Sequence, residues 1–314
     1  MTHKVFIDGE AGTTGLQIRA RLEGRRDVEL IRLPDDRRKD ASARAEALNA
    51  ADAVVLCLPD EAAREAVALI ENPDTRVVDA STAHRVSEGW TYGFPELCRG
   101  QREAVAASKR IANPGCWPTG FLALVRPLAD AGLIPAEQPL SVHGVSGYSG
   151  GGKGMIAEFE GEGAASAPPF RLYGLQLGHK HIPEMQAYAQ LERRPVFSPA
   201  VGRFRQGMLV EVPLSLESLP GAPSAEDLHA ALAAAFEGER FVSVMSRDEA
   251  AATATLSPED LNDTNRLRLF VFGREGEGQA RLVAQLDNLG KGASGAAVQN
   301  LNLCLGLDEA AGLD

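Results

Sequence analysis

The stretch that decides the fold is Val5-Phe6-Ile7-Asp8-Gly9-Glu10-Ala11-Gly12-Thr13-Thr14-Gly15, near the start of the chain. The apolar run 5–7 predicts a buried strand, and residues 15–22 have a helical pattern. Between them the glycines follow a GxxGxxG spacing. Such a turn lets the backbone approach a pyrophosphate closely, and the helix N-terminus then faces the phosphates with its N–H groups. An ordinary glycine-rich turn is the alternative, but the elements that follow favour dinucleotide binding.

Short apolar runs alternate with helical patterns through the first third of the chain. Asp40 is a plausible N-cap for one of the helices. This alternation indicates a parallel sheet with helices on both faces, a Rossmann-type α/β domain. The expected strands are 5–7, 28–33, 53–58, 76–80 and 110–112, and the expected helices are 15–22, 41–49, 61–70 and 100–108.

The later part of the chain has strands that helices do not separate throughout. It predicts an α+β domain whose sheet is mostly antiparallel and packs one face against helices. Ser224 and Asp227 have the spacing of a capping box at the start of one helix. The expected strands are 140–145, 207–213, 241–245, 266–273 and 280–287, and the expected helices are 118–131, 224–236 and 292–305.

The residues after the second strand bear on which dinucleotide binds. They read Asp35-Asp36-Arg37-Arg38-Lys39. Arg37 and Arg38 could meet a 2′-phosphate, which favours NADP, whereas Asp35 or Asp36 could hold the ribose hydroxyls of NAD. A solvated charged loop is the third interpretation.

Cys116, in Asn113-Pro114-Gly115-Cys116-Trp117-Pro118-Thr119-Gly120, has the setting of a nucleophile. It follows a tight turn and precedes a helix, and a helix N-terminus favours the thiolate. Cys57 and Cys304 lie in apolar runs and are expected to be inert, and Cys98 has no evident activating partner. Four cysteines in so long a chain, without a CxxC pair, predict neither a disulfide framework nor a zinc site.

Two histidines flank a lysine in Gly178-His179-Lys180-His181-Ile182-Pro183-Glu184, just before a helix start. In one strand, His179 and His181 would face the same side. One could serve as general acid or base beside Cys116, and the other could bind an anion. Zinc is the competing interpretation, but no third and fourth ligand is evident, so we expect no metal.

Three further stretches could hold anions, although each is weak on composition alone. Ser146, Gly147 and Lys153 belong to the glycine-rich segment 146–154, which could wrap an anion with N–H groups. Arg85 could clamp a carboxylate or phosphate bidentately. Asn288, Lys291 and Gly292 come from Asp287-Asn288-Leu289-Gly290-Lys291-Gly292, which has the composition of another ligand loop.

Composition excludes several classes of protein. The 314 residues are 44% hydrophobic and carry a net charge of −11. That acidity argues against nucleic acid as the main partner, because phosphate backbones need a basic surface. The chain shows neither a membrane-spanning run nor a signal-peptide pattern, so a cytoplasmic protein without a membrane partner is expected.

Together these motifs resemble the N-acetyl-gamma-glutamyl-phosphate reductase family, in its shorter bacterial form, over essentially the whole chain. The resemblance also rests on Tyr92-Gly93-Phe94-Pro95-Glu96-Leu97 and Ala297-Val298-Gln299-Asn300. The sequence departs from the family at Trp117, usually Tyr or Phe, and at Ala83-His84, where an acidic and an aromatic residue usually precede the arginine.

The resemblance implies an NADPH-dependent reduction of N-acetyl-glutamyl 5-phosphate, an acyl phosphate, to the 5-semialdehyde, with release of phosphate. Cys116 would form a thioester, His179 would handle the proton, and His181 would contact the substrate. The resemblance assigns Arg85, Lys153 and Lys180 to the substrate's anionic groups. It assigns to the cofactor Gly9, Gly12, Gly15, Leu58, Pro59, Asn288, Lys291 and Gly292.

The resemblance also implies a domain arrangement and an assembly. Residues 1–115 would bind the dinucleotide, residues 116–290 would form an inserted catalytic and dimerisation domain, and residues 291–314 would return to the first domain. A homodimer or homotetramer is expected. Two alternatives stay open: a related acyl-phosphate reductase such as aspartate-semialdehyde dehydrogenase, and a nucleotide-sensing binding module that lacks catalysis.

Overall fold

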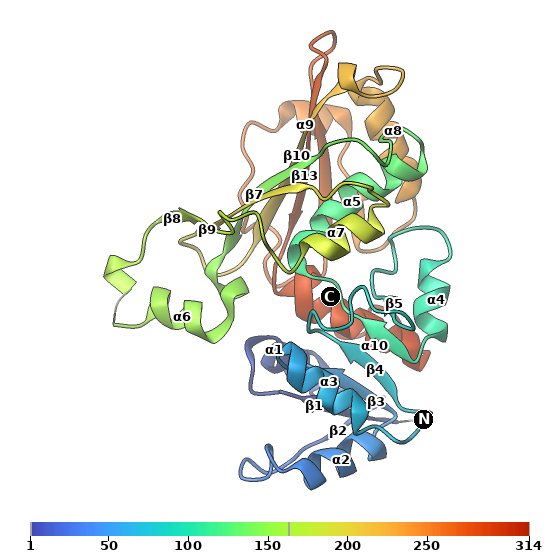
Figure 1. Cartoon of the computed structure of the whole chain (residues 1–314), viewed down its shortest axis with the longest axis vertical. Helices are drawn as coiled ribbons and strands as arrows, with labels where there is room; N and C mark the ends of the chain where they lie inside the picture. The colour runs from blue at the N-terminus through green and yellow to red at the C-terminus, as the bar shows by residue number, and fades with distance from the viewer. Residues whose placement is uncertain (1, 163, 314) are drawn as a thin grey trace. The chain divides into compact units, whose positions relative to one another are not determined.

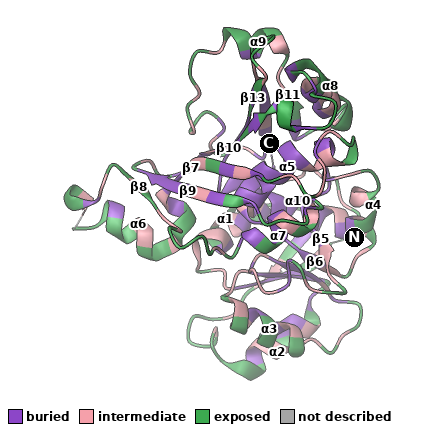
Figure 2. Ribbon diagram, turned by 45° about the horizontal axis from the view of Figure 1, so that its top comes forward, coloured by how far each residue is buried: buried purple, intermediate pink, exposed green. Residues whose placement is uncertain are grey.

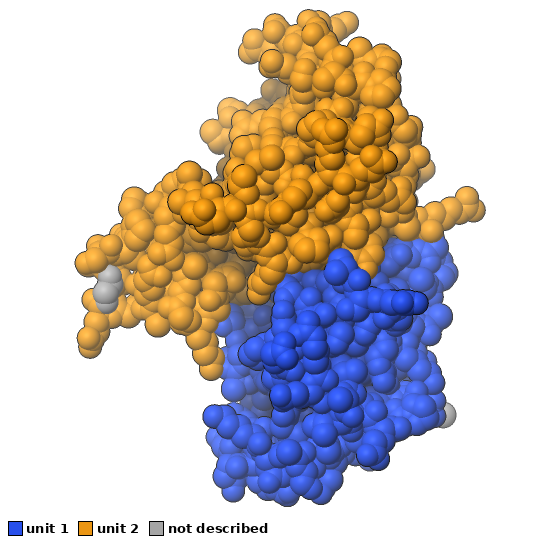
Figure 3. Space-filling view, in the orientation of Figure 1, with its two compact units in different colours: residues 1–95, 100–115, 293–314 blue, residues 96–99, 116–292 orange. Residues whose placement is uncertain are grey.

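The computed structural model describes residues 2–162 and 164–313 of the chain (Figure 1). The chain divides into two compact units, coloured separately in Figure 3. Unit 1 consists of Met1–Pro95, Gly100–Gly115 and Ala293–Asp314, and unit 2 consists of Glu96–Arg99 and Cys116–Gly292. The short segment Glu96–Arg99 therefore goes with unit 2, although the sequence analysis grouped it with residues 1–115. In the described part of the chain, no helix is both long and apolar enough to cross a bilayer.

Unit 1 is built on a six-stranded sheet in which every pairing is parallel. All four residues of β3 are buried, as expected for a strand that helices cover on both faces. Figure 2 colours the chain by burial and shows exposed residues on the covering helices α2 and α3. The Rossmann-type prediction is confirmed. The strands, in spatial order, are β2 (Val28–Ile31), β1 (His3–Asp8), β3 (Ala53–Leu56), β4 (Arg76–Asp79), β6 (Arg110–Ala112) and β5 (Thr91–Tyr92).

The helices of unit 1 come from both ends of the chain. The Asp40 carboxylate accepts a 2.7 Å hydrogen bond from the Ala43 N–H, so Asp40 caps α2 as predicted. Asn300, on the last helix, donates to the Gly93 carbonyl and to the Asn113 side chain. The helices are α1 (Thr13–Leu22), α2 (Ala41–Ala50), α3 (Asp60–Ala68), α4 (Gln101–Ala107) and α10 (Gly295–Leu305), the last preceded by a π-helical turn at Gly290–Ser294.

Unit 2 contains a seven-stranded sheet. Four of its pairings are antiparallel, and two are parallel, β7 with β9 and β11 with β12. The prediction of a mostly antiparallel sheet is confirmed. In spatial order the strands are β11 (Val242–Val244), β12 (Leu267–Phe272), β13 (Gln279–Leu286), β10 (Met208–Ser215), β7 (Ser141–Gly147), β9 (Val196–Gly202) and β8 (Phe170–Leu172).

The strands β8 and β9 are absent from the sequence prediction. Pro199 lies inside β9, and a proline normally argues against a strand because it has no N–H to donate. The register explains its position here. The β8–β9 ladder pairs Leu172 with Ala200 at its end, so Pro199 lies just beyond the last pair.

The helix α5 (Cys116–Asp130) packs on β10, β12 and β13 and fixes the position of its own first residue. A Cβ at Gly120 would lie 2.7 Å from the Val210 side chain, so the helix lies directly on the sheet. Ser224 and Asp227 form the predicted capping box at α8. The other helices of unit 2 are α6 (Gly152–Glu160), α7 (Ile182–Tyr188), α8 (Ala225–Ala235) and α9 (Arg247–Ala252).

Candidate active site

The glycine-rich turn of unit 1 connects β1 to α1, and its glycines are required by close contacts. A Cβ at Gly9, whose φ is +90°, would lie 2.4 Å from the Cys57 carbonyl oxygen. A Cβ at Gly15 would lie 2.6 Å from the Gly9 carbonyl oxygen. Gly12 is the N-cap of α1 and offers no side chain to its N–H groups, while Thr13 and Thr14 begin the helix. The turn therefore presents bare N–H donors, which suits a pyrophosphate.

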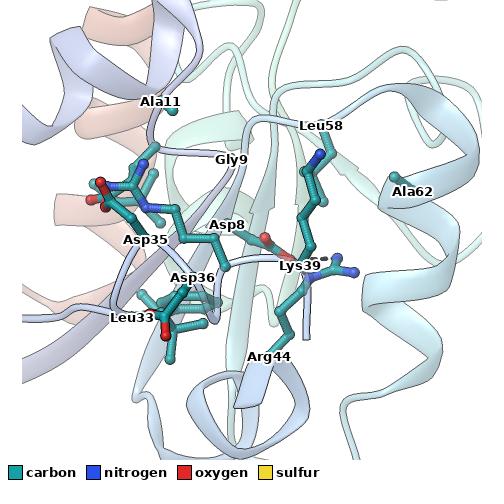
Figure 4. A pocket seen from close by; sticks show the side chains of 14 residues that line it. Asp8, Gly9, Ala11, Leu33, Asp35, Asp36, Lys39, Arg44, Leu58 and Ala62 are labelled. Atoms are coloured by element: carbon teal, nitrogen blue, oxygen red, sulfur yellow. Dashed lines mark hydrogen bonds and ion pairs between the residues drawn. The ribbon is translucent and has the colours of Figure 1, made fainter. Parts of the chain in front are cut away.

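A cavity of about 520 Å³ opens beside this turn, near the carboxyl ends of β1 and β2 (Figure 4). Figure 4 shows the Lys39 side chain extending toward Leu58, and the ion pair of Arg44 with Asp8, 2.8 Å long. Arg38 also lines the cavity and pairs with Asp35 at 2.6 Å. Three cations thus meet at the place where an adenosine ribose would lie in this fold.

Two residues that were predicted to contact the cofactor, Arg37 and Pro59, are not among the residues that line this cavity. Arg37 is exposed, its guanidinium is 3.8 Å from the Asp40 carboxylate, and it is not among the cavity's lining residues. Pro59 is the N-cap of α3, directly after Leu58. The sequence did not predict a role for Arg44, because its position on a helix does not indicate that it faces Asp8 at the end of β1.

Arg85 follows β4 in unit 1, in a turn that a buried carboxylate organises. Asp79 accepts hydrogen bonds from the Ser81 hydroxyl at 2.7 Å and pairs with His84 Nδ1 at 2.6 Å. The His84 ring stacks on Trp90 with 4.1 Å between centroids. Arg85 is buried and donates to the Ala80 carbonyl at 3.3 Å. The turn therefore fixes the backbone position of Arg85. A side chain that binds a ligand needs such support to hold its geometry.

In unit 2, Cys116 is the first residue of α5 and is partly exposed. The helix starts Cys-Trp-Pro-Thr, without an acidic side chain, so its N-terminal partial charge favours the thiolate. Cys57 and Cys304 contrast with it, because burial raises the pKa of each thiol to about 12. Both were expected to be inert.

The two histidines lie side by side in a turn, not in a strand. The His181 N–H donates to Nδ1 of His179 at 3.2 Å, and the two rings are 4.7 Å apart. His181 is also the N-cap of α7. Because Nδ1 of His179 accepts a hydrogen bond, the neutral ring carries its proton on Nε2.

A tyrosine absent from the sequence analysis lies next to one of the histidines. Burial raises the pKa of Tyr173, and the charge of a Cys116 thiolate adds to the shift. Trp117, whose indole N–H can only donate, partly offsets this rise in pKa. The ring of Tyr173 is 5.8 Å from that of His179. Tyr173 therefore lies beside His179, in the same unit as Cys116.

The glycine-rich segment 146–154 ends β7 and leads into α6. Ser146 is buried, and a Cβ at Gly147 would lie 2.6 Å from the Arg205 carbonyl oxygen. Lys153, on α6, and Lys180, between the two histidines, are exposed. These lysines can therefore approach an anion from solvent.

Three residues expected to line the cofactor have well-defined contacts inside unit 2. The Asn288 side chain accepts from the Gly207 N–H and donates to Ser149, which braces the glycine-rich segment. Lys291 is buried and pairs with Glu96 at 2.7 Å. A Cβ at Gly292 would lie 2.7 Å from the Cβ of Cys116, so Gly292 packs against Cys116.

The geometry of the described residues does not support the competing interpretation of the two histidines as zinc ligands. Among residues 2–162 and 164–313, no three His, Cys, Asp or Glu side chains gather as a metal-binding group.

Comparisons with known proteins match both units. Residues 4–106 match the family model "Semialdehyde dehydrogenase, NAD binding domain", and residues 116–288 match "Semialdehyde dehydrogenase, dimerisation domain". Among solved structures, aspartate semialdehyde dehydrogenase II of Vibrio cholerae, complexed with ASA, has a TM-score of 0.73 at 16% identity, covering 97% of this chain and 98% of that one. The Candida albicans enzyme with NADP has a TM-score of 0.63 at 14% identity, covering 96% and 98%. At these identities the structural likeness concerns the fold.

Curated relatives are much more similar in sequence. An N-acetyl-gamma-glutamyl-phosphate reductase of Chelativorans sp. is 58% identical over 97% of this chain and 99% of its own length. N-acetyl-gamma-glutamyl-phosphate reductase 2 of Pseudomonas putida is 55% identical over 99% of both chains. The chain therefore belongs to the semialdehyde dehydrogenase family and, within it, to the N-acetyl-gamma-glutamyl-phosphate reductases.

Proposed function

We propose that this chain reduces N-acetyl-glutamyl 5-phosphate to N-acetylglutamate 5-semialdehyde with NADPH and releases phosphate, as a step of arginine biosynthesis. The observation that carries the proposal is Cys116 at the start of α5, in the same unit as the paired histidines His179 and His181. The identity of 55–58% to reductases of that name, over nearly the whole chain, supports the choice of substrate.

The first step is an acyl transfer to sulfur. The Cys116 thiolate attacks the acyl carbon, and the carbon–oxygen bond to the phosphate breaks, so phosphate leaves with the electron pair. The product is a thioester on Cys116. Lys153, Lys180 and Arg85 hold the anionic groups of the substrate. The Gly147 N–H already donates to the Gly207 carbonyl at 2.9 Å, so Ser146 and Gly147 border the substrate without that donor.

The second step is reduction, for which bound NADPH would supply a hydride to the thioester carbon. The carbonyl oxygen would then become anionic, and the Nε2–H of His179 can donate a hydrogen bond to it, because Nδ1 of His179 accepts the His181 N–H. Collapse of this thiohemiacetal anion re-forms the carbonyl, breaks the carbon–sulfur bond and returns Cys116 as a thiolate. His181 contacts the substrate.

The residues around the turn of unit 1 fit the cofactor. Gly9, Gly12, Thr13, Thr14 and Gly15 bind the pyrophosphate, and Leu58 and Pro59 border it. Arg38, Lys39 and Arg44, which line the cavity, would hold the 2′-phosphate. We retain Asn288, Lys291 and Gly292 as cofactor contacts through backbone atoms, since the contacts described above engage the two side chains.

The assay that tests the function runs the reaction backward. N-acetylglutamate 5-semialdehyde, phosphate and NADP should give phosphate-dependent NADPH formation, with aspartate semialdehyde turned over far more slowly. Cys116→Ala should abolish turnover but leave NADPH binding intact, whereas Cys98→Ala, at another partly exposed cysteine, should retain both. Preference for aspartate semialdehyde would favour the alternative reductase, and binding without turnover would favour a sensing module.

The assembly is also part of the proposal. The match of residues 116–288 to a dimerisation domain supports a homo-oligomer formed through unit 2, a homodimer or a homotetramer. Sedimentation of the purified chain across a concentration series distinguishes these states from a monomer.

A further inference from the structure

The turn after β4 leads from Asp79 to Arg85 and is built around one buried carboxylate. Asp79, at the end of the strand, accepts the Ser81 N–H at 2.9 Å and the Ser81 hydroxyl at 2.7 Å. The same carboxylate lies 2.6 Å from Nδ1 of His84. A carboxylate only accepts hydrogen bonds, so Nδ1 of His84 is the donor. Asp79 therefore connects the start of the turn to the residue before Arg85.

The face of the His84 ring is covered by Trp90. The two rings stack with 4.1 Å between centroids and 9° between planes. The backbone brings them together, because the Ser87 N–H donates to the His84 carbonyl at 3.1 Å and the Trp90 N–H donates to the Ser87 carbonyl at 3.3 Å. The buried His84 ring is thus held at its edge by Asp79 and on its face by Trp90.

Arg85 follows His84 in the chain, so the two contacts of the His84 ring also fix the backbone of Arg85. The guanidinium folds back over the same turn, where its Nη2 donates to the Ala80 carbonyl at 3.3 Å. A side chain that is already ordered loses less conformational entropy when it binds a ligand. The turn lies at the carboxyl end of β4, and in a parallel sheet this is the edge at which ligands bind.

We propose that His84 is a positioning residue for the proposed reaction, because its bond to Asp79 and its stack on Trp90 hold Arg85 in place for an anionic group of the substrate. The group is a carboxylate or a phosphate, which a guanidinium can bind bidentately. His84 itself touches no reacting atom in this role. The inference rests on the proposed function, which assigns Arg85 to the substrate.

Two substitutions separate the two contacts of His84. The amide nitrogen of asparagine is bonded to the same carbon as Nδ1 of histidine, so His84→Asn keeps a donor for Asp79 and loses the stack. His84→Phe keeps a flat ring for Trp90 and loses the donor. His84→Ala loses both contacts. His229, whose Nε2 lies 3.1 Å from the Met245 carbonyl in unit 2, provides a matched control, a hydrogen-bonded histidine away from Arg85.

The test measures the Kd of two stable probes, inorganic phosphate and N-acetylglutamate, by isothermal titration of the full chain. Arg85→Ala identifies the probe that Arg85 binds, since the Kd of that probe rises. His84→Ala should raise the same Kd about tenfold, the scale of one hydrogen bond. His84→Asn and His84→Phe should each raise it less, because each retains one contact, and His229→Ala should leave it unchanged.

Combining the variants distinguishes positioning from a general loss of structure. When Arg85 is already alanine, a further His84→Ala should leave the Kd as it is, because two residues that act through one interaction are not additive. A full additional effect would assign His84 a role apart from Arg85 and overturn the inference. In the backward assay, His84→Ala should raise KM with kcat nearly unchanged, the pattern of lost binding.

The outcomes are distinct from those of the proposed function. An unchanged Kd in a folded His84→Ala, checked by its thermal melt, overturns the inference even if the wild type reduces the proposed substrate. If His84→Ala does not fold, unchanged Kd values in both His84→Asn and His84→Phe overturn it instead. The inference also fails if Arg85→Ala alters the Kd of neither probe. A raised Kd in a protein that does not turn over the semialdehyde supports the role of His84 and removes the proposed function.

Discussion

The two glycine-rich segments of the chain have similar compositions but use glycine for different reasons. In the turn of unit 1, Gly9 and Gly15 lie where a Cβ would meet backbone atoms at 2.4 and 2.6 Å. In the segment 146–154, a Cβ at Gly147 would lie 2.6 Å from the Arg205 carbonyl oxygen, but a Cβ at Gly152 or Gly154, in the first turn of α6, would meet nothing within 4 Å. The first segment needs glycine for close packing, and the second has open space around these positions. Glycine content alone therefore does not distinguish a phosphate-binding turn from an open one.

The largest expected effect comes from adding one methyl group to each segment. Gly9→Ala should lower NADPH affinity at least 100-fold or prevent folding, because the new Cβ meets the Cys57 carbonyl and φ is +90°. Gly154→Ala, on α6, should leave affinity unchanged and raise stability by up to about 1 kcal/mol. Fluorescence titration with NADPH and thermal melts measure both. Equal tolerance of the two substitutions would remove the distinction.

A smaller effect is expected from the cations next to the unit 1 turn. Arg38→Ala should raise the KM for NADPH about tenfold and that for NADH much less, because Arg38 lines the cavity. Arg37→Ala, at an exposed arginine outside the cavity, should change neither. Steady-state kinetics give the KM of each variant for NADPH and for NADH and so test this prediction. If the two arginines behave alike, the cavity is not the 2′-phosphate site.

The smallest expected effect is a change in Tm on removing the cap of α8, whose N-terminus, unlike that of α1, carries a side-chain cap. The Ser224 N–H and hydroxyl both donate to Asp227 at 2.7 Å and hold the pKa of its carboxyl below the ordinary 3.8. A carboxyl with a lowered pKa stabilises the fold above its unfolded pKa and loses that contribution as the pH falls through the folded value. Asp227→Ala should therefore lower the Tm at pH 7 by about 1–2 °C. The difference should vanish in melts well below pH 3.8; persistence there would point to packing instead.

Local signals made the fold predictable. The apolar runs of β1 and β3 and the caps Asp40 and Ser224 act within a few residues, so a sequence pattern contains them. The strand β9 contains Pro199, which disfavours a strand in a sequence pattern. Only the structure shows that β8 ends its pairing at Ala200, so that no hydrogen bond from Pro199 to β8 is needed.

The candidate site was predictable only where one residue carries the chemistry by itself. Cys116 has its helix N-terminus in the adjacent sequence, whereas Arg44 matters through a neighbour far along the chain. Lys291 was predicted to contact the cofactor, but its burial against Glu96 depends on tertiary structure. Proximity in space was the missing information in each case.

The place of α10 has a consequence for how the protein is made. Unit 1 begins with the first strand of the chain, yet it includes the helix Gly295–Leu305, whose Asn300 bonds to Gly93 and Asn113. On the ribosome the N-terminal residues emerge first, but their domain stays unfinished until α10 has also been synthesised. A nascent chain would therefore display the docking surface of α10 throughout the synthesis of unit 2. A fragment that stops at residue 115 would retain the same exposed surface permanently.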